Sequence, residues 1–238
     1  MDVREKVVVI SGATGVLGQA AARMFAENGA QLALLSNDLE KLRSIQAELG
    51  LPGERIMAGV YDLRLAEQAQ QAAAAVNAKF GRADILINVV GGWMGGKPVF
   101  EAPAADTVEM LNQHLWTTYN LIQGFVPGMA QRGWGRVMVV SSTVVRRPTG
   151  MNVSYMIGKS AQEALVLTLA SELQDTGVTA NIIRVRAIDS NRERLSQPSA
   201  KNKNWALPEE IATAMLYLAG EEAGLVNGAI LPLAGAGS

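Results

Sequence analysis

Short apolar runs alternate with longer helical stretches along the chain, and this alternation constrains the fold more than any other feature. The first run, Lys6 to Ser11, holds four consecutive apolar residues, so both of its faces are apolar, as a central strand of a parallel sheet requires. Strands and helices in regular alternation form right-handed crossover units. The sequence therefore predicts an α/β fold with a doubly wound parallel sheet and helices on both faces.

The alternation also sets the expected element boundaries. We expect strands at residues 6–11, 31–35, 55–60, 85–89, 136–141, 179–185 and 229–233. We expect helices at residues 16–28, 38–49, 65–80, 105–132, 154–175 and 208–219, with Asn37 or Asp38 as the cap of the second helix. No repeat, linker or low-complexity segment interrupts the pattern, so residues 1–238 are expected to form a single domain.

Composition excludes several classes of protein. The formal net charge is -1, so no overall field attracts nucleic acid or an anionic membrane, and neither is an expected partner. The chain has no Cys and one His, so we expect no metal site and no disulfide framework. The N-terminus is too charged for a secretory signal and no apolar run is long enough to span a membrane. We therefore expect a cytoplasmic protein.

A glycine-rich loop follows the first expected strand. The segment S-G-A-T-G-V-L-G places Gly12, Gly15 and Gly18 in a strand–turn–helix context, where a backbone turn approaches a pyrophosphate and the helix N-terminus offers free N–H groups. This context predicts a dinucleotide site and a Rossmann fold. The second expected strand ends in Ser36-Asn37-Asp38, with no Arg for a 2′-phosphate. Asp38 lies late for a ribose contact and equally suits a helix cap, so the choice between NAD and NADP stays open.

Three further residues form a chemical pattern. Tyr155 and Lys159 stand at i and i+4, on one face of an expected helix, where a nearby cation would stabilise a phenolate and lower the pKa of the tyrosine. Ser142 lies thirteen residues before Tyr155, at the end of an expected strand. The start of the helix brings Tyr155 back beside that strand end, so the three residues are candidates for one acid–base site.

The glycine loop and the Ser142, Tyr155 and Lys159 set resemble the short-chain dehydrogenase/reductase superfamily over the whole chain. The resemblance implies that Tyr155 exchanges a proton with the substrate oxygen and that Ser142 holds that oxygen. It implies that Lys159 holds the nicotinamide ribose and lowers the Tyr155 pKa. The main branch has the fingerprint TGxxxGxG, whereas Val16 stands here at the position of its middle glycine.

The same resemblance implies the remaining cofactor contacts and a division of labour along the chain. Residues from about 1–145 are expected to bind the dinucleotide, and residues from about 146–238 to supply catalysis and the substrate loop. The implied cofactor-binding residues are Gly12, Thr14, Gly15, Val16, Leu17, Gly18, Ser36, Asn37, Asp62, Leu63, Asn88, Gly91, Tyr155 and Lys159.

One position of the family pattern differs. The family has an Asn in the long helix twenty-eight residues before the Ser, and His114, the sole His, stands at the matching place here, with Asn112 nearby. His114 either takes over part of the proton relay, as a neutral imidazole that donates and accepts, or is a packed helix residue. We include it among the candidate catalytic residues.

Three short segments resemble dihydropteridine reductases, a divergent branch of the same superfamily: V-G-G-W-M-G-G at 90–96, L-W-T-T at 115–118, and the segment from Asn191-Arg192 to Trp205. Trp93 and Trp205 could stack on a flat ring, and with Ser142 they are the expected substrate residues. The presence of Ser142 favours ordinary carbonyl or alcohol chemistry.

The predicted function is therefore an NAD(P)-dependent oxidoreductase that transfers a hydride to or from a small carbonyl or alcohol substrate. A pterin reductase is the first alternative and a non-catalytic cofactor-sensing protein the second. By analogy with the family, we expect a homotetramer or homodimer.

Overall fold

Seven parallel strands form one sheet at the centre of the computed structural model, which describes residues 2–233. The strand order is β3-β2-β1-β4-β5-β6-β7, so β1 pairs with β2 on one side and with β4 on the other, and the chain reverses its direction of travel across the sheet at that point. The strands are β1 (Val7–Ser11), β2 (Gln31–Ser36), β3 (Ile56–Val60), β4 (Ile85–Asn88), β5 (Gly135–Ser142), β6 (Val178–Val185) and β7 (Ile230–Leu233).

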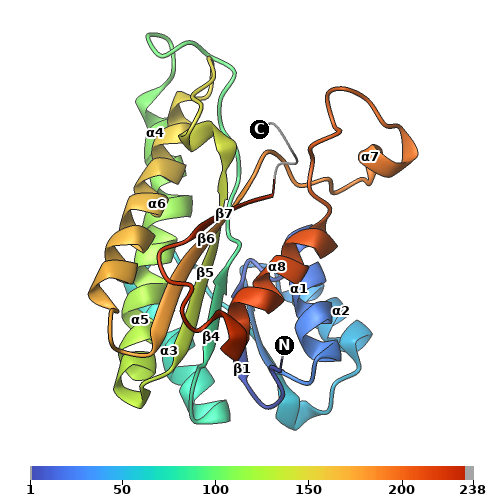
Figure 1. Ribbon diagram of the computed structural model, residues 1–238, viewed down its shortest axis with the longest axis vertical. Coiled ribbons are helices and arrows are strands. Elements are labelled where there is room, and N and C mark those ends of the chain that lie inside the picture. Colours follow the sequence, from blue (N-terminus) through green and yellow to red (C-terminus); the bar gives the residue numbers. More distant parts are fainter. Residues whose placement is uncertain (1, 234–238) are drawn as a thin grey trace.

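Helices cover both faces of the sheet (Figure 1). One face carries α1 (Val16–Glu27), α2 (Leu39–Leu49) and α8 (Pro208–Ala219), and the other carries α3 (Ala66–Phe80), α5 (Thr117–Arg132) and α6 (Val153–Glu172). The shorter helical segments are η1 (Gly53–Arg55), α4 (Ala104–Leu111), the π-helical turn η2 (Asn112–Trp116), η3 (Thr143–Val145), α7 (Glu193–Ser196) and η4 (Glu221–Ala223).

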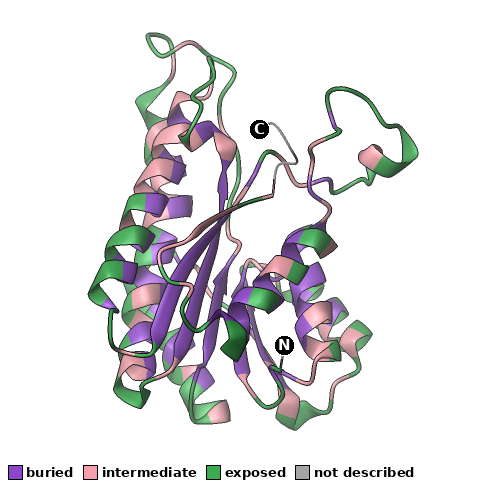
Figure 2. Ribbon diagram, in the orientation of Figure 1, coloured by how far each residue is buried: buried purple, intermediate pink, exposed green. Residues whose placement is uncertain are grey.

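Two apolar cores lie on the two sides of the sheet because successive side chains of a strand point to opposite faces. In β1, Val8 and Ile10 join the core under α1, α2 and α8, whereas Val7 and Val9 join the core under α3, α5 and α6. All five residues of β1 are buried, and the buried colour runs along the strands in Figure 2. The apolar runs of the sequence are therefore strands that serve both cores at once.

The predicted fold class is confirmed, and the expected strands and helices are present with small shifts of their ends. Asp38 caps α2, because its carboxylate accepts the backbone N–H of Lys41 at 3.1 Å. The expected single helix at residues 105–132 differs: it is α4 and α5 joined by the π-helical turn η2. A π-helical turn inserts an extra residue into a helix, often at a functional site. The short helix α7 was not expected.

The loops that follow β1, β4, β5 and β6 meet at one edge of the sheet, at the top of Figure 1. Ligands of such sheets bind at this edge, next to the point where strand order reverses. Among residues 2–233, no helix has both the length and the apolar character that crossing a membrane requires.

The turn between β1 and α1 contains the closest backbone approach of this edge. A Cβ atom added to Gly18 would lie 2.3 Å from the carbonyl oxygen of Gly12. Gly12 has a φ of 75°, and a Cβ there would lie 2.9 Å from the amide nitrogen of Val90, in the loop after β4. Because these neighbours are backbone atoms, they cannot rotate out of the way as a side chain would.

We expect Gly18→Ala to lower the free energy of unfolding by about 1–3 kcal/mol, because the added methyl group forces the β1–α1 turn apart. Urea denaturation measures this loss. Gly53→Ala is the matched control, since a Cβ at Gly53 meets no atom within 4 Å. Equal stability of the two variants would contradict the close packing of this turn.

Candidate functional site

The first cavity at the carboxyl edge has a volume of about 360 Å³ and lies over the β1–α1 turn. Gly15 is the N-cap of α1 and has no side chain to cap the helix, so the N–H groups of the first turn are free to meet an anion. The cavity is lined by Gly12, Thr14, Gly15, Ser36, Asn37, Tyr61, Asp62, Leu63, Arg64, Val89, Val90, Gly91, Gln113 and Thr117. A dinucleotide fits this cradle, because the turn offers backbone donors and glycine leaves the space that a Cβ would fill.

The end of β2 supplies neither an acidic side chain for the ribose of NAD nor an Arg for the 2′-phosphate of NADP. The hydroxyl groups of Thr14 and Ser36 share a hydrogen bond of 2.7 Å, and Asn37 lines the cavity beside them. Asp38 is turned to α2, where it caps the helix and pairs with the Lys41 ammonium at 3.0 Å. Asp38 therefore acts as a helix cap, as the alternative interpretation held.

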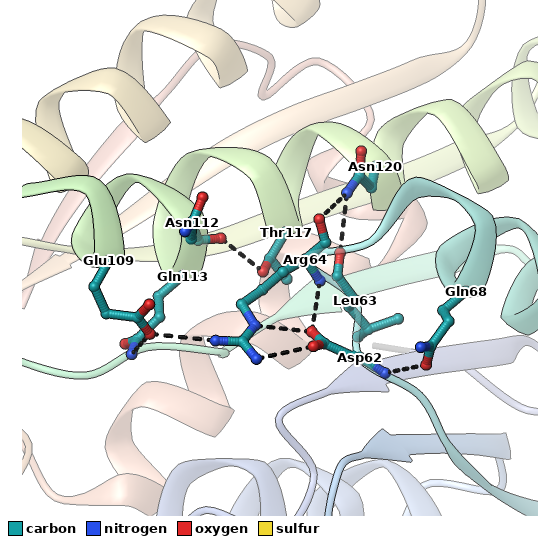
Figure 3. A network of polar contacts seen from close by, with 9 residues as sticks. All are labelled: Asp62, Leu63, Arg64, Gln68, Glu109, Asn112, Gln113, Thr117 and Asn120. Carbon is teal, nitrogen blue, oxygen red and sulfur yellow. Dashed lines mark hydrogen bonds and ion pairs between the residues drawn. The ribbon is translucent and has the colours of Figure 1, made fainter. Parts of the chain in front are cut away.

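A polar network fixes the loop after β3 at the far end of the first cavity (Figure 3). Both carboxylate oxygens of Asp62 accept from the Arg64 guanidinium, at 2.9 and 2.8 Å, and this pairing lowers the pKa of Asp62. Arg64 also approaches Glu109 of α4 at 3.4 Å, and the Asn120 amide of α5 donates to the carbonyl oxygens of Leu63 and Arg64. The sequence did not single out Arg64, because its contacts with Glu109 and Asn120 join segments that are distant along the chain.

The second cavity, of about 350 Å³, adjoins the first, and the two share Val89, Val90 and Gly91 in their walls. It collects Ser142 from the end of β5, Tyr155 and Lys159 from the first turns of α6, and His114 from η2. Ser142 and Tyr155 interact across this cavity, because the Ser142 hydroxyl lowers the pKa of Tyr155. The structure therefore brings all four candidate catalytic residues to one cavity.

Lys159 is buried at the base of this cavity. Its ammonium donates to the Val140 carbonyl oxygen at 2.8 Å and to the Gln162 side-chain oxygen at 2.9 Å. Burial lowers the pKa of Lys159 to about 7, and the charge of Glu163 opposes this shift. The lysine is thus held by the protein itself, close to the balance between its charged and neutral forms at neutral pH.

The pKa of Tyr155 departs from the expectation. Burial raises it above its usual value, and the Ser142 hydroxyl opposes that shift without reversing it. The predicted lowering by Lys159 is therefore wrong for this structure, because the ammonium points to Val140 and Gln162 and the phenol lies in a desolvated pocket. Tyr155 holds its proton at neutral pH.

A row of buried hydrogen bonds continues from Lys159 beneath both cavities. The Gln162 amide donates to the Thr118 hydroxyl at 2.8 Å, and the Asn88 amide donates to the same hydroxyl at 2.8 Å. Asn88 in turn accepts from the Ser11 hydroxyl at 2.8 Å. Asn88 therefore supports the site from below, and it is not among the residues that line either cavity.

His114 is fully buried in η2, and its ring lies edge-on to Tyr155 with 5.5 Å between ring centroids. Its Nε2 lies 3.2 Å from the carbonyl oxygen of Gly92, whereas its Nδ1 has no hydrogen-bond partner among residues 2–233. Burial and then the charge of Lys159 lower the pKa of His114 to about 3, so the imidazole is neutral. With Nε2 as the donor to Gly92, Nδ1 is a buried and unused acceptor.

The two tryptophans that were expected to meet the substrate differ in position. Trp93 lines the second cavity, with its side chain 59% exposed and its indole N–H donating to Asn152 at 2.8 Å. Trp205 lies in the segment between α7 and α8 and lines neither this cavity nor the first. Its expected contact with the substrate stays a prediction; in this structure the segment turns back, with backbone hydrogen bonds from Trp205 to Asn202 and from Ala206 to Ala187.

Of the implied cofactor contacts, Leu17 lines the second cavity, while Val16 lines neither cavity and is 46% exposed. Gly91 is pressed against the histidine: a Cβ there would lie 3.0 Å from Cε1 of His114. Within residues 2–233, no three His, Cys, Asp or Glu side chains are grouped so as to hold a metal ion.

Comparisons with known proteins agree with this geometry. Residues 6–200 match the family model described as short chain dehydrogenase. Nodulation protein G of Azospirillum brasilense is 29% identical over 242 residues and covers 97% of both chains. D-threitol dehydrogenase of Mycolicibacterium smegmatis is 29% identical, over 97% of this chain and 92% of its own. A solved short-chain type dehydrogenase/reductase from Mycobacterium ulcerans shares the fold, with a TM-score of 0.89, 19% identity and coverage of 98% and 89%.

The neutral, buried His114 predicts how stability depends on pH. Its pKa in the folded protein lies below the unperturbed value of 6.5, so the unfolded chain takes up the proton first as the pH falls. Between pH 6.5 and about 3, His114 should therefore remove up to about 1.4 kcal/mol of stability per pH unit.

Urea denaturation of the wild-type protein and of His114→Asn over this pH range measures the effect. His114 is the sole His of the chain, and the variant replaces its imidazole by an amide that does not titrate. The wild type should therefore lose more stability on acidification than the variant. Parallel stability curves of the two proteins would contradict a neutral His114.

Proposed function

The chain belongs to the short-chain dehydrogenase family, and on that premise we propose that it transfers a hydride between NAD or NADP and a small carbonyl or alcohol substrate. It is an oxidoreductase. The observation that carries the proposal is the meeting of Ser142, Tyr155 and Lys159 in the second cavity, which adjoins the dinucleotide cradle along Val89 to Gly91.

Tyr155 and Ser142 each have a definite part in reduction. The bound cofactor supplies the hydride to the carbonyl carbon. The Tyr155 hydroxyl, which keeps its proton at neutral pH, donates that proton to the carbonyl oxygen, and the Ser142 hydroxyl donates a hydrogen bond to the same oxygen. Oxidation of an alcohol is the reverse step, in which the proton moves from the alcohol to Tyr155; it requires the phenolate form and is therefore favoured above neutral pH.

Lys159 and His114 line the same cavity as Tyr155 and have supporting parts in this proposal. Hydrogen bonds to Val140 and Gln162 hold Lys159 in place, and in this proposal its side chain binds the hydroxyl groups of the nicotinamide ribose. His114 remains neutral, so in a proton relay its Nδ1 can only accept a hydrogen bond. This atom has no hydrogen-bond partner among residues 2–233. The choice between NAD and NADP stays open, since Asn37 carries no charge.

A pterin reductase is the second candidate function. Trp93 supports it, because its ring forms an exposed part of the cavity wall and is oriented by Asn152, as a stacking surface for a flat ring would be. A non-catalytic sensor is set aside, because the chain is an enzyme of this family. The homo-oligomeric state and the cytoplasmic location remain predictions.

Tyr155→Phe should lower the rate of carbonyl reduction by about 10²- to 10⁴-fold, because the variant has no proton to donate. The measurement follows the absorbance of the reduced nicotinamide with a panel of ketones, alcohols and quinonoid pterins and with both cofactors. Tyr119→Phe makes the same change on α5, where the ring packs on Trp116, and should keep full activity. Full activity of Tyr155→Phe would contradict the mechanism.

A further inference from the structure

An outer cavity of about 460 Å³ continues from the second cavity toward the surface. The two cavities share Trp93, Ser142, Tyr155 and Arg186, so a substrate oxygen held between Ser142 and Tyr155 leaves the rest of the molecule room to extend outward. Arg147, after η3, lines only the outer cavity. The outer cavity is therefore the place for the part of the substrate that does not react.

Two unpaired arginines stand at this outer cavity. Arg186 directly follows β6, and both Arg186 and Arg147 are exposed. Neither side chain forms a hydrogen bond or ion pair with any residue of the range 2–233, whereas nearby arginines are paired: Arg192 with Glu209 at 2.5 Å and Arg194 with Glu210 at 2.6 Å. Two guanidinium groups thus face the same space without a counter-charge.

The walls of the cavities contain no acidic side chain that would neutralise these arginines. The lining of the second and outer cavities includes Lys159, Arg147 and Arg186 and no Asp or Glu. A concave surface with one sign of charge attracts the opposite charge and concentrates it. A guanidinium group also binds the oxygens of a carboxylate or phosphate with two parallel hydrogen bonds.

We propose that the substrate carries a carboxylate or phosphate group, which Arg186 binds and Arg147 assists, at the end remote from the reacting carbonyl. This proposal rests on the proposed function and adds the substrate class. It also assigns Arg186 and Arg147 as specificity residues. The dinucleotide cradle is lined by neither arginine, so the cofactor phosphates have their own donors at α1.

The test compares matched anionic and neutral substrates: acetoacetate with methyl acetoacetate, and dihydroxyacetone phosphate with dihydroxyacetone. In at least one pair, the wild-type enzyme should have a higher kcat/KM for the anionic substrate than for the neutral one. A preference in the acetoacetate pair indicates a carboxylate site, and a preference in the dihydroxyacetone pair indicates a phosphate site. Arg186→Gln should lower that anionic-to-neutral ratio by about 10- to 100-fold, mainly through KM, and Arg147→Gln should lower it less.

Arg146→Gln is the matched control, since Arg146 is an exposed neighbour that lines neither cavity and has no side-chain partner among residues 2–233. It should leave the ratio at the wild-type value. Equal kcat/KM for the anionic and neutral members of both pairs would overturn the proposal. So would an Arg186→Gln enzyme that keeps the ratio but binds the cofactor more weakly, because Arg186 would then serve the cofactor phosphates.

A binding measurement separates this proposal from the proposed function. If the cofactor binds and no carbonyl compound is turned over, the proposed function fails. The quenching of tryptophan fluorescence by acetoacetate or by dihydroxyacetone phosphate, with cofactor bound, then decides the anion site. Weaker binding to Arg186→Gln than to the wild type supports the site, and equal binding overturns it.

Discussion

The site depends on the row of buried hydrogen bonds that runs from Lys159 through Gln162 and Thr118 to Asn88. This row ties α6 to α5 and to β4, and both α6 and the loop after β4 line the second cavity. A buried polar group that loses its partner costs about 1–3 kcal/mol, so each member of the row holds its neighbours in place. The Thr118 hydroxyl also donates to the carbonyl oxygen of His114, and through this bond the row anchors η2.

Burial sets the charge state of the inner site, and unpaired arginines set that of the outer one. The pKa of His114 and that of Lys159 are lowered and the pKa of Tyr155 is raised, and desolvation is the largest cause of each shift. All three shifts favour the neutral form. The reacting oxygen therefore meets a proton donor in a dry pocket, while Arg147 and Arg186 provide positive charge nearer the surface.

Much of the fold could be predicted from the sequence because its signals are local. The apolar runs gave the strands, and the spacing of Gly12 and Gly18 gave the turn over the first cavity. The π-helical turn η2 could not be predicted, because no residue type marks it inside a long helical pattern, and its register depends on contacts such as that between Thr118 and His114. The path of the segment that carries Trp205 could not be predicted either, because the path of a long polar segment depends on its tertiary contacts.

The site was predictable in its residue types but not in its electrostatics. The spacing of Ser142, Tyr155 and Lys159 brought them to one cavity, as expected. The direction of the Tyr155 pKa was wrong, because the partners of Lys159 come from β5 and from its own helix. Sequence spacing shows which side chains share a face, and the hydrogen bonds that each one makes depend on how the elements pack.

A crystal structure with NAD or NADP bound tests the central claim most directly. The account predicts that the pyrophosphate lies against the turn from Gly12 to Gly18 and that the nicotinamide ring enters the second cavity beside Tyr155 and Ser142. A cofactor bound elsewhere, or a nicotinamide ring turned away from Tyr155, would contradict the claim that this cavity is where the hydride is transferred.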